Sequence, residues 1–272
     1  MHFCGYLGPG KVKQQIDKRI FRAYNNRNSI GKEVLPLSIT EKAKQSILSG
    51  ITPIRLGWYK VCPCDDGGAA LLRSVLILEN LELGVLTPAQ YRFVARRTKQ
   101  GDALVERHLE MLLSTWRWER RDVEAVTVPV YPRVLLSGKL AYLLFEGFAR
   151  HPEAAASRLC IECSSDILFE DFELVQQQWQ ALRKMGVKLA ISEVGEDFCP
   201  LTRLAALRPD YVFADAAKLS LLEQEGSSLE QLCQYLHLSN ARVYLPPLAD
   251  PGQKHSGKSA GFDGWVEQEV AL

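Results

Sequence analysis

The chain has 272 residues, a formal net charge of +1 and 47% hydrophobic residues, a composition typical of a folded globular protein. Its near-neutral charge excludes a general electrostatic attraction to nucleic acid or to anionic membranes. No segment approaches the roughly 18 consecutive apolar residues of a membrane-spanning helix, and Gly and Lys interrupt the start of the chain before a signal-peptide core.

Residues 1–50 are basic, and we expect a short helical extension there because they contain too few apolar residues for an independent core. Between positions 1 and 44, nine Lys or Arg residues stand against three acidic residues. Apolar residues at helical spacing predict a helix over 11–24. Ser38 and Glu41 form a capping box for a second helix. The charge is typical of a solvated helix face, and the alternative is a contact surface for an acidic partner.

Strand and helix patterns alternate from residue 54 onward. The expected elements are strands over 54–65 and 69–78, helices over 88–97 and from 102, a strand over 126–132 and a helix over 140–150. On the second helix, Leu104, Leu109, Leu112 and Trp116 should face the core, and His108 should lie on the solvated face. Pro129 has no N–H group to donate, so we expect the end of its strand to be locally irregular.

The segment from Arg158 to Asp215 has the clearest pattern. It reads as a strand over 159–163, a helix opened by Asp171, a strand over 187–191, a short helix over 200–207 and a strand over 211–215. In the first of these helices, Phe172, Val175, Trp179 and Leu182 recur at steps of three and four, which places them on one face. A helix over 228–238 and a strand over 242–245 follow. This alternation predicts βαβ units and a parallel sheet.

The motifs in this order resemble those of the EAL domain, the cyclic-di-GMP phosphodiesterase family. The matching segments are Leu83–Pro88, Glu162–Ser165, Leu182–Gly186, Leu189–Gly195, Leu201–Leu204, Phe213–Asp215 and Phe262–Trp265. The resemblance covers about residues 54–266. It implies an α/β fold, an EAL-like (β/α)8 TIM-type barrel over residues 51–272, preceded by the extension at 1–50.

The same resemblance implies a site whose chemical groups are mostly replaced. Enzymes of the family hydrolyse a phosphodiester with metal-activated water, and a ring of oxygen ligands at the carboxyl ends of the barrel strands holds the metal. In this chain, Arg73 stands in place of the first Glu of the family and Pro129 in place of its Asn. Ser192 and Glu193 replace the Asp pair, Phe213 replaces the Lys, and Asp263 replaces the Gln. Glu162 and Asp215 are kept. The position of a further Glu, which the family carries in an Ala-Glu-Gly-Val-Glu motif near the end of the domain, corresponds to the region of Pro246 and Pro247 in this chain.

With these ligands lost and a cation added, we expect no metal, no cofactor and no phosphodiesterase activity. Glu162 and Asp215 should pair with Arg73 or another donor, because buried acids need partners.

A second motif, Gly252–Ser259, matches the P-loop pattern G-x-x-x-x-G-K-S. A P-loop must directly follow a strand and open a helix, whereas three prolines, at 246, 247 and 251, precede this segment. Two glycines and the end of the chain follow it, which leaves no room for the sheet of an NTPase. We therefore interpret the segment as a flexible loop, with nucleotide binding as the alternative.

The cysteines offer a third pattern. Cys62 with Cys64 and Cys160 with Cys163 could supply four thiolates to zinc. Both pairs fall on expected strands, and Cys160 and Cys163 should point to opposite faces, so buried core cysteines are favoured. Seven cysteines without an export signal predict reduced thiols in a cytoplasmic protein.

These observations predict a catalytically inactive EAL-like regulatory protein that acts by binding another protein, in bacterial motility, biofilm formation or gene expression. Lys18, Arg19 and Arg22 are the first candidates for the contact surface, and a homodimer is compatible with this function. The alternative is a cyclic-di-GMP receptor that does not hydrolyse its ligand. Ligand contacts in the family also use the strand that carries Arg73 here and a Gln where this chain has Lys60, and neither position is intact.

Overall fold

The computed structural model describes residues 54–65, 69–80, 84–118, 120, 122–194, 200–215, 229–247 and 257–269. The expected extension at 1–50, with Lys18, Arg19 and Arg22, lies outside these residues. The strands are β1 (Ile54–Pro63), β2 (Ala70–Asn80), β3 (Gly84–Leu86), β4 (Val123–Val130), β5 (Leu159–Ser164), β6 (Lys188–Val194), β7 (Tyr211–Ala214), β8 (Arg242–Leu245) and β9 (Gly264–Glu269). The α-helices are α3 (Pro88–Arg97), α4 (Gln100–Thr115), α5 (Pro132–Leu136), α6 (Lys139–Arg150), α7 (Phe172–Lys184), α8 (Leu201–Leu207) and α10 (Leu229–His237).

The sheet closes into a barrel of eight strands. Its order is β1-β9-β8-β7-β6-β5-β4-β2, β1 also pairs with β2, and β3 is added outside the ring on β2. β1 is antiparallel to both of its neighbours, and the other barrel strands run parallel to one another. The short turn between β1 and β2 permits only an antiparallel pair, whereas the helical connections allow parallel strands. The expected (β/α)8 barrel is confirmed.

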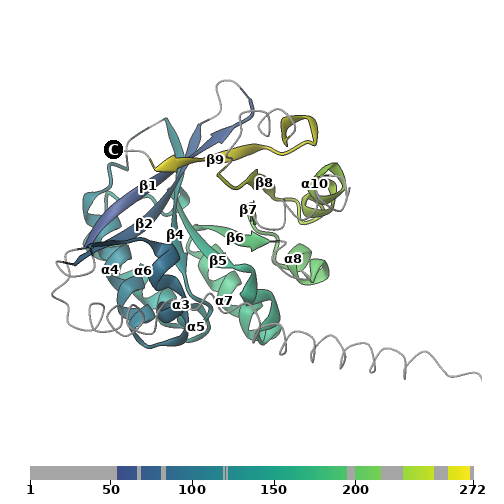
Figure 1. Ribbon diagram of the computed structural model, residues 1–272. Helices are drawn as coiled ribbons and strands as arrows, with labels where there is room; N and C mark the ends of the chain where they lie inside the picture. The colour runs from purple at the N-terminus through teal and green to yellow at the C-terminus, as the bar shows by residue number, and fades with distance from the viewer. Residues whose placement is uncertain are drawn as a thin grey trace, which may run out of the picture. The chain divides into compact units, whose positions relative to one another are not determined.

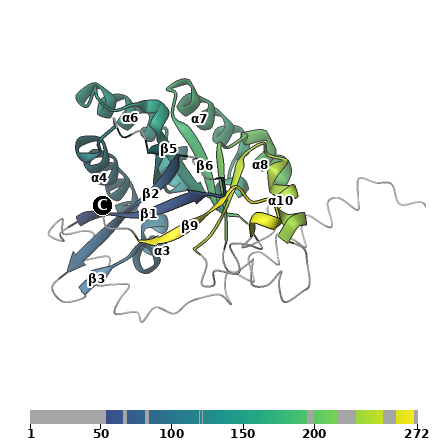
Figure 2. The same ribbon diagram turned by 90° about the horizontal axis from the view of Figure 1, so that it is seen from above.

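Side chains alternate between the inside and the outside of the barrel. On β5, Cys160 packs in the interior with Tyr211, Phe213 and Tyr244, whereas Cys163 belongs to the layer between strands and helices. Helices α4, α6, α7, α8 and α10 surround the strands on that outer side (Figures 1 and 2). The two thiols therefore point to opposite faces, as expected, and cannot join in one metal site.

Helix α3 brings its basic residues to the open end of the barrel. It begins at Pro88 after Thr87, whose backbone N–H donates to the Gln90 side chain at 2.7 Å. Tyr91 anchors the helix, because its hydroxyl donates to the Leu76 carbonyl of β2 at 2.7 Å and its ring is buried. This anchoring places Arg92 and Arg96 next to the end of β6.

Most expected elements lie within a few residues of the observed ones, and the 88–97 helix and the 242–245 strand have the expected bounds. Two local predictions were wrong. The first was the irregular strand end at Pro129, because β4 pairs with β5 without a break in register across this residue. On the other side of β4, the pairing with β2 ends at Thr127, so the β2–β4 ladder needs no N–H donor at Pro129. His108 is only 2% exposed, because Ser74 of β2 offers a partner to its ring.

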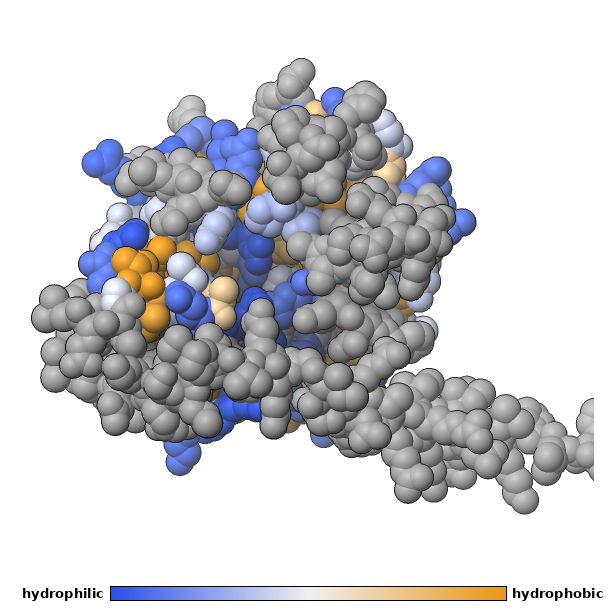
Figure 3. Space-filling view, viewed as in Figure 1, coloured by the Kyte–Doolittle hydropathy of each residue, from blue (hydrophilic) through white to orange (hydrophobic). Residues whose placement is uncertain are grey.

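The surface of the described residues is mixed. On the face in Figure 3, hydrophilic residues fill much of the coloured area and hydrophobic residues gather mainly in one group at its left. Among the described residues, no helix is both long and apolar enough to span a membrane.

Candidate functional site

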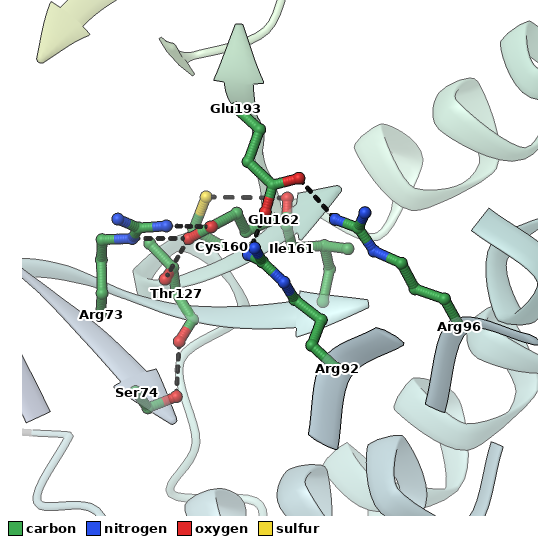
Figure 4. A network of polar contacts seen from close by, with 9 residues as sticks. All are labelled: Arg73, Ser74, Arg92, Arg96, Thr127, Cys160, Ile161, Glu162 and Glu193. Carbon is green, nitrogen blue, oxygen red and sulfur yellow. Dashed lines mark hydrogen bonds and ion pairs between the residues drawn. The ribbon is translucent and has the colours of Figure 1, made fainter. Parts of the chain in front are cut away.

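Two carboxylates stand near the carboxyl ends of the parallel strands, and arginines hold both. The first is Glu162 on β5, which is 5% exposed. Arg73 of β2 forms a bidentate pair with it, with Nε donating to Oε2 at 3.0 Å and an Nη group donating to Oε1 (Figure 4). The Thr127 hydroxyl of β4 donates to the same carboxylate at 2.9 Å. Hydrogen-bond donors therefore surround Glu162.

The electrostatics of this pair favour the charged forms. Burial alone would raise the pKa of Glu162, but Arg73 outweighs burial and the pKa is lowered, with further hydrogen bonds from Thr127 and Ser192. Burial alone would lower the pKa of Arg73, and Glu162 outweighs it, so that pKa is raised. The guanidinium also lies 4.3 Å from the centre of the Phe213 ring. Arg73 is thus fixed between an acid and an aromatic face.

The second carboxylate, Glu193 of β6, is clamped by helix α3. Arg92 and Arg96 are four residues apart on α3, so they share a face, and each forms an ion pair with one oxygen of Glu193 (Figure 4). Arg96 also reaches Asp166 at 3.1 Å. Glu193 adopts φ of 60°, a left-handed conformation that is uncommon for a non-glycine residue, and the Ser165 hydroxyl donates to its carbonyl at 2.8 Å.

A buried polar chain supports the site from below. The Ser74 hydroxyl donates to the Thr127 carbonyl at 2.5 Å and lies 2.8 Å from Nε2 of His108. Burial lowers the pKa of His108 to about 3, so this histidine is neutral at physiological pH and acts as a packing and hydrogen-bonding residue. The chain links α4, β2 and β4 beneath Glu162.

The structure brings most of the residues identified in the sequence together. Pro129 pairs in register with Glu162 of the neighbouring strand. The Ser192 side chain forms a hydrogen bond with the Glu162 carboxylate, and the Phe213 ring lies against the Arg73 guanidinium. Asp215 follows β7, where its backbone N–H donates to the Val194 carbonyl at 3.1 Å, and is partly buried.

Asp263 does not join this group. It precedes β9 and therefore lies at the amino-terminal ends of the parallel strands. Its carboxylate accepts a hydrogen bond from the Val243 backbone at 2.6 Å. The placement of Asp263 beside the other site residues was wrong, because the resemblance gave its order in the chain and not its height in the barrel.

These residues do not fit a divalent metal. A hard cation needs several free oxygen ligands, and arginine N–H groups occupy the oxygens of Glu162 and Glu193. Across the described ranges, no cluster of three or more His, Cys, Asp or Glu side chains could hold a metal ion.

Sequence reasoning missed Arg92, Arg96 and Asp166. The two arginines look like the polar face of a surface helix, and only the tertiary fold shows that this face meets β6. The one available signal was their spacing: Arg92 and Arg96 are four residues apart in an expected helix, so they lie on the same face of that helix.

The Gly252–Ser259 motif falls partly outside the described residues. Gly257, Lys258 and Ser259 are described and are helical, so the loop expected there is wrong for this part. Lys258 donates to the Cys64 carbonyl at 3.1 Å.

Comparison with known proteins identifies the fold's family. The model of the EAL domain matches residues 62–252. A search of curated proteins found no match. Among solved structures, the chain is similar to the PaMucR phosphodiesterase in a c-di-GMP complex, with 15% identity, a TM-score of 0.71 and coverage of 85% of this chain and 94% of that one.

Two further structures show the same likeness. The FimX EAL domain from Pseudomonas aeruginosa bound to c-di-GMP has 16% identity and a TM-score of 0.68, with coverage of 84% and 93%. An EAL domain protein from Listeria monocytogenes has 12% identity and a TM-score of 0.66, with coverage of 88% and 95%. At these identities the structural likeness shows the fold, and the matched family model adds that this chain belongs to the EAL domain family.

Proposed function

We propose that this EAL domain is a catalytically inactive regulatory module that acts by binding another protein. One observation carries the proposal: arginine side chains hold both Glu162 and Glu193, two of the three acids at positions that the resemblance to the family assigns to metal binding. A metal-activated water needs free oxygen ligands to hold its metal, and none of these four oxygens is free. The fold remains complete, so its surface is still available for contacts.

We place this module in the cytoplasm of a bacterium, in the control of motility, biofilm formation or gene expression. This is the use that inactive members of the family imply. Its target is a protein, and a homodimer is compatible with the same function.

The alternative is a cyclic-di-GMP receptor without hydrolysis. It is supported by two of the three solved structures compared above, which are described with c-di-GMP bound. Against it stands Arg73, which is engaged with Glu162 and Phe213 and would have to leave both to meet a ligand phosphate.

One set of measurements separates these functions. We expect no Mg²⁺-dependent hydrolysis of cyclic-di-GMP, no change in the melting temperature with cyclic-di-GMP, and no change with Mg-ATP or Mg-GTP that depends on Lys258 of the Gly252–Ser259 segment. A ligand at about 100 times its Kd would add about 2.7 kcal/mol and raise the melting temperature by about 5–10 °C. The PaMucR phosphodiesterase, measured in parallel, is the positive control for the hydrolysis assay.

Hydrolysis would overturn the inactive module. A shift with cyclic-di-GMP alone would support the receptor. A shift with a nucleoside triphosphate that the Lys258→Gln variant abolishes would support binding at Gly252–Ser259.

The basic N-terminal segment supplies a second prediction. Reversing the charges of Lys18, Arg19 and Arg22 together should weaken capture of the partner in a pull-down from the native cytoplasm, because an acidic partner would lose its counter-charges. Reversal of Lys42 and Lys44 in the same segment is the matched control. Equal capture by the wild type and the triple variant would exclude this segment as the contact surface.

A further inference from the structure

A polar hollow lies at the amino-terminal ends of β6, β7 and β8, at the opposite end of the barrel from the carboxylates described above. Its volume is about 630 Å³. The helices α7, α8 and α10 precede these strands in the chain (Figure 1), and residues from the junctions between them line the hollow. The residues that matter for its charge are Arg183, Lys188, Arg208, Asp210, Arg242 and Asp263.

The cations of this hollow outnumber its acids. Four residues, Arg183, Lys188, Arg208 and Arg242, are cationic, and the lining contains two aspartates. A third acid, Glu124 of β4, lies behind them and pairs with Lys188 and Arg242. Burial alone would raise the pKa of Glu124, but Arg242 and Lys188 outweigh it and lower the pKa to about 2, so these three charges neutralise one another in part.

The aspartates are also committed to partners. Asp210 accepts the Leu189 backbone N–H at 2.8 Å and lies 3.7 Å from Arg183. Asp263 accepts the Val243 N–H and lies 3.6 Å from His237.

Arg208 is the remaining cation. Its side chain is exposed, and it forms no ion pair with any residue that the structure describes. Arg183 donates to its backbone carbonyl, which fixes the position of the main chain.

The backbone of Arg208 is the second observation. Arg208 caps α8 with φ 48° and ψ 61°, the left-handed conformation in which glycine is least strained. At the end of the preceding helix, α7, the left-handed residue is a glycine, Gly186 with φ 83°, which follows the C-cap Met185. An arginine in place of glycine costs about 1 kcal/mol of backbone strain. A charged side chain kept at this cost indicates a role for that side chain.

We propose that this hollow binds a small molecule that carries a phosphate or pyrophosphate group, with Arg208 as the residue that contacts the anion. Guanidinium groups bind phosphate oxygens in a bidentate manner, and Arg183 and Arg242 supply further positive charge around the same hollow. The site is separate from the candidate site at the carboxyl ends, so it does not depend on the function proposed above.

A purely structural role for Arg208 makes a different prediction. A cation at a helix C-terminus is favoured by the helix dipole, and Arg208 stands at the end of α8. In that case its removal would alter stability and leave anion binding unchanged.

The variant Arg208→Gly separates the two. It relieves the left-handed strain and should raise the melting temperature by about 2 °C, after the larger chain entropy of glycine is subtracted. The same change removes the proposed contact and should weaken pyrophosphate binding about tenfold or more, measured by calorimetry on the full chain at constant ionic strength without Mg²⁺. Arg208→Lys, which keeps the charge, should retain part of the affinity.

Two controls locate the bound anion. Arg107 of α4 is also exposed and also lacks an ion pair among the described residues, so Arg107→Gln should bind pyrophosphate as the wild type does. Lys258→Gln tests the Gly252–Ser259 segment and should bind normally. The proposal is overturned if the wild type does not bind pyrophosphate or inorganic phosphate, if Arg208→Gly binds as the wild type does, or if only Lys258→Gln loses binding.

Discussion

Replacing Arg73 by methionine should lower the free energy of unfolding by about 3–5 kcal/mol, because Glu162 would remain buried without its counter-ion. Glu162 is only 5% exposed, so its carboxylate has little contact with solvent. Urea unfolding at pH 7, followed by far-UV circular dichroism, measures the loss. A double variant, Arg73→Met with Glu162→Gln, is the matched control: it removes the charge and keeps an oxygen for the Thr127 hydroxyl, so it should recover most of the stability.

The pH dependence of this loss follows from the sign of the pKa changes. In the wild type the pKa of Glu162 is lowered from 4.5, so its charge stabilises the fold above that value, and this contribution is lost as the pH falls. In Arg73→Met, burial without a counter-ion would raise the pKa, so destabilisation would grow as the pH rises. The two proteins should be closest in stability near pH 4 and furthest apart near pH 7. A difference that is the same at both pH values would contradict the ion pair as its source.

Replacing Gly264 by alanine should also destabilise the fold, by about 3 kcal/mol. Gly264 begins β9 and pairs with Pro63 of β1, where the barrel closes. An added Cβ would lie 2.1 Å from the Cys62 carbonyl oxygen and 3.0 Å from the Pro63 Cα. Both are backbone atoms, so no side-chain rotation relieves the clash and the two strands must move apart. Urea unfolding of the variant measures the cost.

Gly84→Ala is the control for the general effect of removing a glycine. Gly84 has φ of 72°, and no heavy atom lies within 4 Å of a Cβ added there. Its replacement should cost only the backbone strain, about 1 kcal/mol. Losses of equal size in the two variants would show that contact across the β1–β9 pair is not the cause.

The barrel could be predicted from the sequence because its signals are local and repeated. Apolar runs of strand length alternate with helical patterns, and one example is Phe172, Val175, Trp179 and Leu182. Of these, Val175, Trp179 and Leu182 are buried against the strands. A periodicity of this kind involves only residues that are close in the sequence, so it can be recognised without knowledge of the fold.

The site could be predicted only in part, because its state depends on contacts between distant residues. The pairing of Glu162 with Arg73 was expected from the need of a buried acid for a partner, and it is confirmed. The pairing of Glu193 with Arg92 and Arg96 joins residues about 100 positions apart and leaves no local pattern. The prediction that His108 is exposed to solvent was wrong for the same reason: its hydrogen-bond partner, Ser74, lies on a strand that is distant in the sequence.

The closure of the barrel also has a consequence for how the protein folds. β1 and β9 are paired, although β1 begins at Ile54 and β9 ends at Glu269. A nascent chain cannot form this pair until β9 has left the ribosome, more than 200 residues after β1, and until then β1 and β8 each keep one unpaired edge. Such edges promote aggregation, and pairs of this sequence separation are slow to form because a long loop must close first. Chains truncated before Gly264 should therefore accumulate as aggregates, even though every residue of the candidate site at the carboxyl ends is present.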